Sequence, residues 1–400
     1  MKRLLPLLLS LVMILVPVAG LAEAAKVTGD PIVFGLTTPV TGAQAAGGLQ
    51  AQNGMKLRIA EENAKGGIQL GDTWHLIELK VEDDQGDATL TDTTVRKLVS
   101  EGAVAIFGPY FSGQTLALDA TIRELKVPLI NSATSVKIPL LQNPWLWRTR
   151  CDDGINVQIL GKAAVDDYVA KNGSAEGLKV GIVCANDETG TSVANSYKEY
   201  FTKNGVEFYE DYHNKDDADL SAYVQKAVAA GVNAWVSSTH DIAAAALAKA
   251  MYEAGLTEQI VYMNPILAQT EVLNLMEPEW VEGWGCVSDY AASDPREKQA
   301  AFTAAWVEMY GSNPTPDVQG ALYYSHTSVI IEAIKNAGTA ESSAIRDAIA
   351  AMRGFETVVG TVYASEFTNL LYEISIAKIN NLVPTIVGSV SVAADYGFGK

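Results

Sequence analysis

The sequence is poor in the residue types that build metal sites and disulfide frameworks. It has 3 cysteines and 4 histidines among 400 residues, too few for a disulfide scaffold or a cluster of soft metal ligands. Its 29 basic residues are outnumbered by 47 acidic ones, for a net charge of −18. Nucleic acid requires a basic surface. We therefore expect no nucleic acid partner, no metal and no cofactor.

Charged residues are also scarce, at 19%, whereas apolar residues make up 48%. A disordered chain would be more polar, and this apolar content is enough for a buried core. At the usual size of about 100–200 residues per domain, the length allows two domains.

A long apolar run occurs only once, at the amino terminus. Lys2 and Arg3 precede the run 4–21, and the small residues Ala22, Ala24 and Ala25 follow as cleavage positions. This order is typical of a secretory signal, here residues 1–25. No cysteine precedes Cys151, so the lipid-attachment residue of a lipoprotein is absent. We predict an exported periplasmic protein, with an uncleaved amino-terminal anchor as the alternative.

Motifs of catalysis are missing as well. The sequence contains no Gly-x-Ser-x-Gly elbow, no P-loop, no Gly-x-Gly-x-x-Gly after a strand and no His-Glu-x-x-His. His240 alone is more typical of a hydrogen-bonding or capping group than of a general base. Asp187 and Glu188 either meet a cationic group or are exposed loop acids. We predict that the protein is not an enzyme.

What the chain does have is a strand–helix alternation that occurs twice at nearly the same spacing. Such alternation predicts an α/β fold of two doubly wound, mostly parallel sheets, each forming one lobe. The first half predicts strands at 32–36, 75–81, 104–107 and 127–130 and helices at 49–64, 89–100 and 114–125. The second predicts strands at 180–183, 206–209, 234–236 and 260–263 and helices at 190–204, 220–230 and 241–254. Helices at 297–310, 320–337 and 343–352 and a last strand at 372–378 complete both lobes.

Two such lobes predict a ligand site where their sheet edges face each other. Ligands of open α/β sheets bind beyond the carboxyl ends of the strands, where helix N-termini offer free N–H groups. The turns at these ends are 37–48, 108–115 and 131–135 in one lobe and 186–190, 237–241 and 264–269 in the other.

Two of these turns are suited to a carboxylate or an amide. Ser112 begins a helix after Gly108 and Pro109, and small polar residues fill 131–135. Backbone amides and hydroxyls in such places bind anions. The alternatives are a helix N-cap at Ser112 and an ordinary polar turn at 131–135.

The order and spacing of several short motifs resemble the leucine/isoleucine/valine-binding protein family over nearly the whole chain after residue 25. The motifs are Pro39-Val40-Thr41-Gly42, Asn63-Ala64-Lys65-Gly66-Gly67-Ile68, Gly108-Pro109 with Ser112 and Thr115, Val127-Pro128-Leu129-Ile130 before Ala133-Thr134, and Asn186-Asp187 before Gly190.

The resemblance implies a periplasmic solute-binding subunit of an ABC importer, with a type I periplasmic-binding-protein fold. Its lobes would be 26–148 with 290–370 and 149–289 with 371–400, joined by crossings near 147–151, 288–291 and 369–372. They would close over a small-molecule ligand by a hinge motion. An ABC permease in the inner membrane would be the partner, and we expect a monomer.

The resemblance also implies site residues. Ser112, Ser132 and Thr134 match positions that hold the ligand's carboxylate or amide, Ala133 lies between the last two, and Tyr110 matches a pocket-lining position. From the strand-end turns of the second lobe, and not from the resemblance, we expect Thr189, His240, Asn264 and Ile266 to line the site.

Three positions depart from the family pattern. Ile266 stands where an acid usually pairs with a ligand ammonium, Thr189 replaces an aromatic residue, and 45–47 are small residues in place of a bulky one. A buried ammonium without a partner is costly. We expect either a ligand that is not an ordinary α-amino acid, such as an amide or an acid with an aromatic or other apolar body, or pairing by Glu188 or Asp241.

Two other functions remain open on sequence alone: a ligand-sensing receptor module with the same cleft, and an exported α/β hydrolase. For Cys184 and Cys286, buried free thiols are the expectation, and Cys151 could pair with either.

Overall fold

The computed structural model describes residues 27–42, 44–365, 369–371 and 373–392. The predicted export signal, residues 1–25, lies outside them. Among the helices described, none has the length and apolar character needed to cross a membrane.

The first large sheet has five strands, and every neighbouring pair is parallel. Alternate residues such as Phe34 and Leu36, and all of 105–107, are fully buried. Such apolar strands are typical of a sheet covered by helices on both faces. In spatial order the strands are β5 (Ile77–Asp83), β2 (Ile32–Thr38), β6 (Ala103–Phe107), β7 (Leu129–Asn131) and β8 (Leu146–Arg148).

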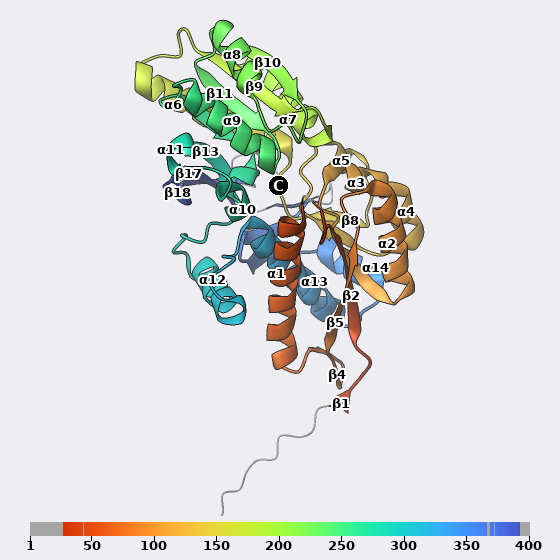
Figure 1. Cartoon of the computed structure of the whole chain (residues 1–400). Coiled ribbons are helices and arrows are strands. Elements are labelled where there is room, and N and C mark those ends of the chain that lie inside the picture. Colours follow the sequence, from red (N-terminus) through yellow and green to blue (C-terminus); the bar gives the residue numbers. More distant parts are fainter. Residues whose placement is uncertain (1–26, 43, 366–368, 372, 393–400) are drawn as a thin grey trace, which may run out of the picture.

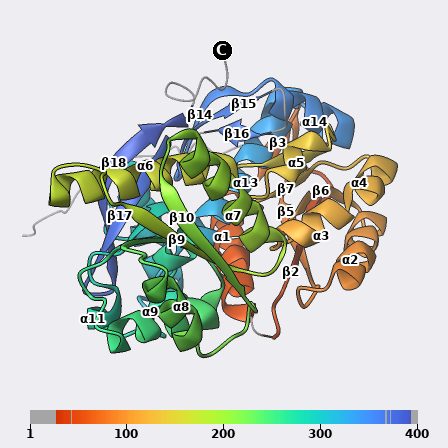
Figure 2. The same ribbon diagram turned by 90° about the horizontal axis from the view of Figure 1, so that it is seen from above.

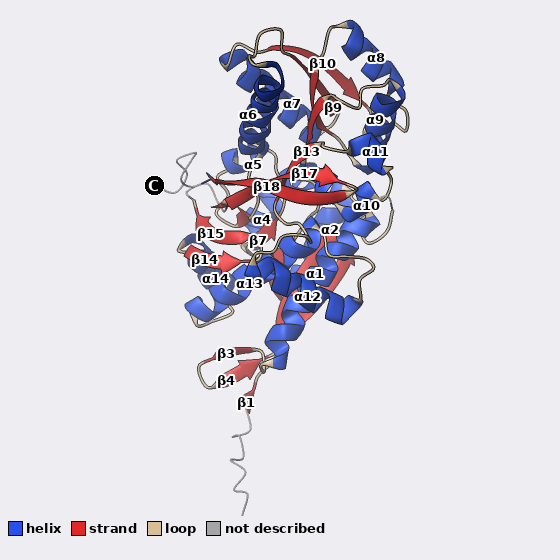
Figure 3. Cartoon of the chain, turned by 90° about the vertical axis from the view of Figure 1, so that its left-hand side faces the viewer, coloured by secondary structure: helices blue, strands red, loops and turns tan. Residues whose placement is uncertain are grey.

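The second large sheet has seven strands. Its first five are parallel neighbours, whereas the last two pair antiparallel. In spatial order they are β10 (Glu207–His213), β9 (Lys179–Ala185), β11 (Ala234–Ser238), β12 (Ile260–Met263), β13 (Gly285–Ser288), β17 (Glu373–Asn380) and β18 (Val383–Ser391). Figure 3 shows β17 and β18 at mid-height, between α6 above and α13 below.

Helices accompany each sheet, and Figure 1 shows the two groups in separate halves of the molecule. With the first sheet are α1 (Ala45–Ala64), α2 (Ala88–Ser100), α3 (Ser112–Ala117), α4 (Asp119–Leu125), α5 (Lys137–Leu140), α12 (Glu297–Tyr310), α13 (Val318–Ala337) and α14 (Ser342–Ala350). With the second are α6 (Asp153–Asn172), α7 (Glu188–Lys203), α8 (Ser221–Ala229), α9 (Asp241–Glu253), the 3-10 turn η1 (Pro265–Ala268), α10 (Thr270–Leu273) and α11 (Pro278–Val281).

Two small sheets extend the first half. One comprises β1 (Val27–Thr28), β4 (Thr73–His75) and β3 (Ile68–Leu70), and the other β14 (Arg353–Thr357), β15 (Gly360–Ala364) and β16 (Leu370–Leu371).

Helices α1 and α13 pack unusually closely because glycines meet at their contact. A Cβ added to Gly54 on α1 would lie only 2.1 Å from the carbonyl oxygen of Gly320 on α13. Any side chain at this point would therefore have to push the two backbones apart.

The predicted α/β fold with two sheets is confirmed, two predictions for single elements are corrected, and one helix was missed. The helix expected over 114–125 is divided at Leu118 into α3 and α4. Helix α6 was not predicted because glycines interrupt its pattern; one of them, Gly161, faces the ring of Tyr200 on α7. The strand at 372–378 is not the last, since β18 follows β17. Pro384 weakens the signal of β18, but an edge strand tolerates proline.

The chain passes between the two sheets three times: between β8 and β9, between β13 and α12, and between β16 and β17. Away from these crossings the halves also approach each other directly. Figure 2 shows α7, which accompanies the second sheet, beside α3, which accompanies the first.

Candidate functional site

A cavity of about 80 Å³ lies where strand ends of the two sheets face each other. The loops after β6 and β7 line it from one side, and those after β9, β11 and β12 from the other. The sequence predicted this geometry, because the carboxyl ends of parallel strands share one sheet edge. All nine residues predicted for the site line the cavity: Tyr110, Ser112, Ser132, Ala133, Thr134, Thr189, His240, Asn264 and Ile266.

Eight more residues line the same cavity. Five belong to the predicted turns: Phe111, Ser238, Thr239, Pro265 and Gln269. Three lie outside every predicted turn, namely Arg150, Asp153 and Gln319. The first predicted turn, 37–48, contributes no residue to this cavity; there Thr37 is fully buried and bonded to Asp84 and Thr94.

Ser112 joins the two loops of the first lobe. Its hydroxyl oxygen accepts hydrogen bonds from the backbone N–H groups of Thr134 and Ser135, at 3.3 Å each. Ser112 is the first residue of α3, and Phe111 occupies the N-cap position, so the N-cap alternative for Ser112 is wrong. A hydroxyl that accepts twice keeps its own proton for donation. Ser112 can thus donate to a ligand oxygen.

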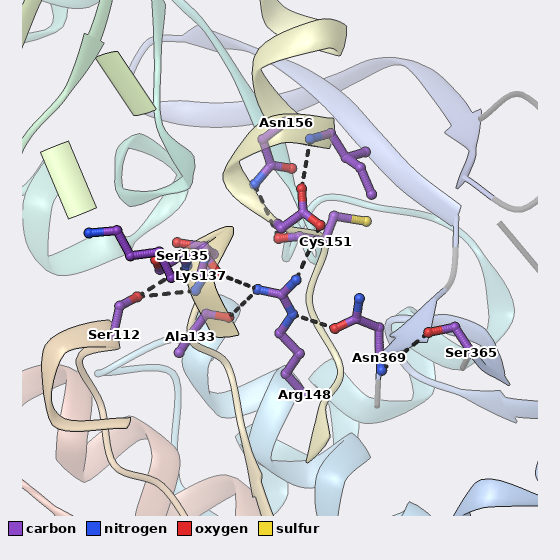
Figure 4. A network of polar contacts seen from close by, with 12 residues as sticks. Ser112, Ala133, Ser135, Lys137, Arg148, Cys151, Asn156, Ser365 and Asn369 are labelled. Carbon is purple, nitrogen blue, oxygen red and sulfur yellow. Dashed lines mark hydrogen bonds and ion pairs between the residues drawn. The ribbon is translucent and has the colours of Figure 1, made fainter. Parts of the chain in front are cut away.

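Arg148 fixes the backbone of the loop that carries Ser132, Ala133 and Thr134. Figure 4 shows its guanidinium between this loop and the start of α6. It donates to the carbonyl oxygens of Ser135 at 2.9 Å and Ala133 at 3.5 Å. Its other nitrogens reach Asn369 at 2.6 Å and Asp152 at 3.1 Å. This fully buried arginine therefore connects a cavity wall to two of the chain crossings.

Asn264 plays the corresponding part in the second lobe. Its side-chain amide donates to the carbonyl oxygen of Thr239 at 3.2 Å and accepts from the Thr239 N–H at 3.4 Å. Next to it, His240 Nε2 lies 2.5 Å from Asp187 Oδ2. Asp187 also accepts from Gly190 N–H at the start of α7, so it has a local structural role rather than the role of a ligand acid.

Tyr110 fills the space that the small residues 45–47 leave. These residues form the first turn of α1, and none lines the cavity. A Cβ on Gly47 would lie 2.7 Å from Tyr110 Oη. The expected extra room for a large ligand is therefore taken by the protein's own phenol ring. The cavity of about 80 Å³ is smaller than the ~150 Å³ that accommodates benzene elsewhere.

The turn before Tyr110 requires glycine. Gly108 has φ +89°, and a Cβ there would lie 2.0 Å from the carbonyl oxygen of Thr37. Only glycine adopts this conformation without strain. The Gly108-Pro109 motif thus directs Tyr110 and Phe111 to the cavity.

Neither acid that the sequence offered for ligand pairing lines the cavity. Glu188 accepts from Ser135 Oγ at 3.1 Å and from Lys137 Nζ at 2.9 Å, which joins the two lobes at the rim. Asp241 begins α9 outside the cavity lining. Ile266 lines the cavity and is 8% exposed, so this wall carries no charge. Neither Glu188 nor Asp241 is therefore part of the inner lining, and pairing of a ligand by either acid stays a prediction.

The charged lining comes instead from the first crossing. Arg150 forms a buried ion pair with Asp289 at 2.7 Å, which joins the first crossing to the second. Asp153, the first residue of α6, is 3% exposed, and burial raises the pKa of its carboxyl to about 7. Sequence reasoning missed both; the pair Asp152-Asp153 is a helix-start signal that could have located α6 and this wall.

A larger cavity of about 680 Å³ adjoins the first and shares Phe111, Thr189 and His240 with it. Its lining includes the polar or charged residues Gln44, Asp187, Glu188 and Lys215. The rings of Phe111 and His240, 6.1 Å apart and edge-on, stand between the inner cavity and this outer one.

The three cysteines are buried and free, as expected for Cys184 and Cys286. Within the part of the chain that the structure describes, no group of three or more His, Cys, Asp or Glu side chains could hold a metal ion.

The chain is similar to Leu/Ile/Val-binding protein homologs of other bacteria. The chain is 25% identical over 356 residues to Leu/Ile/Val-binding protein homolog 3 of Brucella melitensis, covering 88% of this chain and 91% of the relative. It is 27% identical over 338 residues to Leu/Ile/Val-binding protein homolog 2 of Brucella abortus, covering 83% and 85%.

Solved structures share the fold. The substrate-binding protein LivJ of Streptococcus pneumoniae, in complex with isoleucine, superposes with a TM-score of 0.77 at 23% identity and covers 90% of this chain and 99% of its own. A solute-binding protein of Rhodopseudomonas palustris, in complex with 3,4-dihydroxybenzoic acid, gives 0.77 at 24% identity, covering 92% and 99%.

The sequence profile of the periplasmic binding proteins matches residues 31–380. The predicted two-lobed type I fold with three crossings is thereby confirmed. The chain belongs to the periplasmic binding protein family, the family of the Leu/Ile/Val-binding proteins.

Proposed function

We propose that this protein is the extracytoplasmic solute-binding subunit of an ABC importer and captures a small carboxylate, amino acid or amide by closure of its two lobes. One observation carries the proposal: the inner cavity is lined by strand-end loops of both sheets. A ligand there touches both halves at once. Its binding energy therefore favours the closed arrangement over an open one.

The moving bodies of this proposal are residues 26–148 with 290–370 and residues 149–289 with 371–400. The chain passes between the sheets near both sets of limits. Buried polar contacts join the crossings: Arg148 bonds Asn369, and Arg150 pairs with Asp289. Such contacts hold the hinge together while the rims separate. At the rim, the contact of Glu188 with Ser135 and Lys137 is partly exposed, and exposed ion pairs are weak enough to break.

The hydroxyl-rich wall favours a ligand with a carboxylate or an amide. Ser112, Ser132 and Thr134 stand at neighbouring strand ends, where hydroxyl and N–H donors bind anionic or carbonyl oxygens. The two solved relatives above hold isoleucine and 3,4-dihydroxybenzoic acid; both ligands carry a carboxylate. For this chain, the wall of Ser112 and Thr134 is the proposed carboxylate subsite.

The remaining features of the proposal follow from this role. The protein works as a monomer outside the cytoplasmic membrane after removal of residues 1–25. It delivers its ligand to a membrane permease, needs no cofactor and leaves the ligand chemically unchanged.

Thermal unfolding tests the proposal. The purified protein is heated with L-leucine, L-valine, propionate, benzoate, acetamide and propionamide, each in turn. A ligand at 100 times its Kd adds about 2.7 kcal/mol of stability, a clear rise in Tm. We expect at least one compound to raise Tm and to be recovered unchanged.

Ser112→Ala provides the site-specific arm. It removes one hydroxyl donor, so the same compound should bind about tenfold more weakly. The control is Ser196→Ala on α7, whose hydroxyl donates to the Ser192 carbonyl oxygen of the same helix. The proposal fails if no small carboxylate, amino acid or amide binds, if Ser112→Ala binds like wild type, or if the protein consumes the compound.

A further inference from the structure

A polar contact outside the lining of both cavities joins the two lobes at the start of α13. Asp317 caps α13 in the first lobe, and Glu271 belongs to α10 in the second; neither lines the inner or the outer cavity. Gln50 on α1 reaches the same point, where its amide donates to Glu271 Oε1 at 3.1 Å and to the carbonyl oxygen of Thr315 at 2.8 Å. Figure 1 shows α10 beside the upper end of α1.

Two carboxyl groups meet at this contact, and each has one oxygen without a donor. The side chains of Asp317 and Glu271 are in hydrogen-bond contact. Asp317 Oδ1 accepts from the Gly320 N–H at 3.0 Å, and Glu271 Oε1 accepts from Gln50. Asp317 Oδ2 and Glu271 Oε2 are buried, and no residue that the structure describes donates to them. Two ionised carboxylates have no donor between them, so this contact becomes a hydrogen bond only when one of them carries a proton.

The surroundings of Asp317 favour that proton. Burial raises the pKa of its carboxyl well above 3.8, and the negative charge of Glu271 raises it further, whereas the N–H groups of Gly320 and Gln319 oppose the rise. Two acids in contact at a buried point cannot both ionise, and they titrate as a pair. The pair therefore keeps one proton at pH values where a water-exposed aspartate has lost its own.

Other titratable groups face the pair from neighbouring loops and helices: Tyr110 after β6, Tyr290 after β13 and Asp241 on α9. Burial raises the pKa of both phenols, so neither ring carries a charge. Burial also raises the pKa of Asp241, and the charge of Glu271 raises it further. Arg150 acts on Tyr110 and is paired with Asp289. The three groups that face the pair are therefore neutral or acidic, which favours the shared proton.

We infer that Asp317 and Glu271 form a proton-dependent latch between the lobes, sharing one proton when the lobes are closed and losing it when the lobes part. This inference rests on the proposed function and adds a pH control to its closure step. When the lobes separate, Glu271 leaves with α10, and water reaches both carboxyls, so each ionises as an exposed acid does. Closure over a ligand therefore takes up a proton from the solvent. By linkage, affinity for the ligand falls as the pH rises.

Calorimetry on the mature protein at pH 6, 7 and 8 tests the latch. The probes are L-leucine, L-valine, propionate, benzoate, acetamide and propionamide, all of which keep their charge over this range. For a compound that binds, we expect uptake of about 0.5 to 1 proton at pH 7, seen as a heat that depends on the ionisation enthalpy of the buffer. The same proton count corresponds to a Kd that rises about 3- to 10-fold per pH unit.

Variants assign the proton to this pair. Glu271→Gln is a neutral substitute whose amide can donate to Asp317 while its oxygen still accepts from Gln50, so it should abolish the uptake and flatten the pH dependence of Kd. Asp317→Asn should do the same, since asparagine also caps helices, and it serves if Glu271→Gln fails to fold. The control is Glu277→Gln, the same change of charge at an exposed acid of the same lobe, and it should behave as wild type. Asp153 is present in every variant, so its own protons cancel in the comparison.

The outcomes distinguish the latch from the proposed function. If a compound binds but both pair variants keep the proton uptake and pH dependence of wild type, the latch is overturned while the proposed function stands. The latch also fails if wild type takes up no proton, or if Glu277→Gln abolishes the uptake as Glu271→Gln does. If no compound of the panel binds, the proposed function itself is overturned, and the latch with it.

Discussion

Replacing Asp153 by asparagine should stabilise the ligand-free protein at alkaline pH. Burial raises the pKa of this carboxyl from 3.8 to about 7, so its charged form is less favourable in the folded state than in the unfolded chain. A shift of about 3 pH units at about 1.4 kcal/mol per unit corresponds to about 4 kcal/mol of lost stability. The neutral amide of Asp153→Asn does not carry this penalty.

The sign of the effect sets its pH window. Below pH 3.8 the carboxyl is protonated in both states, and Asp153 contributes no penalty. As pH rises toward 7 the unfolded chain ionises first, so the penalty grows, and above about pH 7 it is constant. The stability gain of Asp153→Asn should therefore be up to about 4 kcal/mol at pH 8 and below about 2 kcal/mol at pH 5.

Urea unfolding of wild type and variant at the two pH values measures this gain. The matched control is Asp152→Asn, one residue earlier. Asp152 pairs with the fully buried Arg148, so its replacement should cost about 2 kcal/mol or more at both pH values. The reasoning is refuted if Asp153→Asn destabilises the protein at pH 8, or if its gain is the same at pH 5 and pH 8.

Three further predictions concern the framework around the site. Gly54→Ala should lower the free energy of unfolding by more than about 2 kcal/mol, because its Cβ would meet a backbone carbonyl of α13. The control Gly113→Ala places its Cβ in open space, so its free energy of unfolding should stay within about 1 kcal/mol of wild type. Equal effects of the two variants in urea unfolding would contradict the close packing of α1 and α13. Burial lowers the pKa of His326 from 6.5 to about 3, so only the unfolded chain takes up its proton between these values. Stability should then fall below about pH 6.5 by up to about 1.4 kcal/mol per pH unit, and His326→Gln should flatten this decline; parallel curves for wild type and variant would oppose the assignment. Arg150→Met alone should cost about 3–5 kcal/mol, because it removes the cation of a buried ion pair with Asp289. Adding Asp289→Leu should recover at least half of the loss, and no recovery in the double variant would show that the two side chains act independently.

Much of the cavity could be predicted from the sequence because one rule locates it. Parallel strands place their carboxyl ends at one edge, so locating β6, β7, β11 and β12 was enough to predict most of the lining. The predicted strand boundaries are off by a few residues, but the turns are longer than these errors, so the predicted turns still contain most of the lining residues. The family resemblance then selected positions within those turns.

Three lining residues, Arg150, Asp153 and Gln319, lie outside the strand-end turns, so the order of the strands could not predict them. Arg150 follows β8 at a chain crossing, and Asp153 begins α6. This helix was not predicted, because its glycines interrupt the apolar pattern. Gln319 comes from α13, far away in sequence, and contacts Ser132 through packing of the whole lobe. Contacts of this kind are set by tertiary structure, which single-sequence patterns do not encode.

The small residues 45–47 show a second kind of error. Their small side chains correctly predicted that space is left beside the start of α1, but the sequence did not show which side chain fills that space. In the structure Tyr110 lies against Gly47, so a position that predicted a larger ligand instead accommodates a ring from the neighbouring loop.

A crystal structure of the protein with the compound that raises its Tm most would test the central claim directly. The account predicts that the intact compound lies in the inner cavity, with an oxygen within hydrogen-bond distance of Ser112 or Thr134 and contacts to the Asn264 loop of the other lobe. A compound bound elsewhere on the surface, or a cleaved product in the cavity, would contradict it.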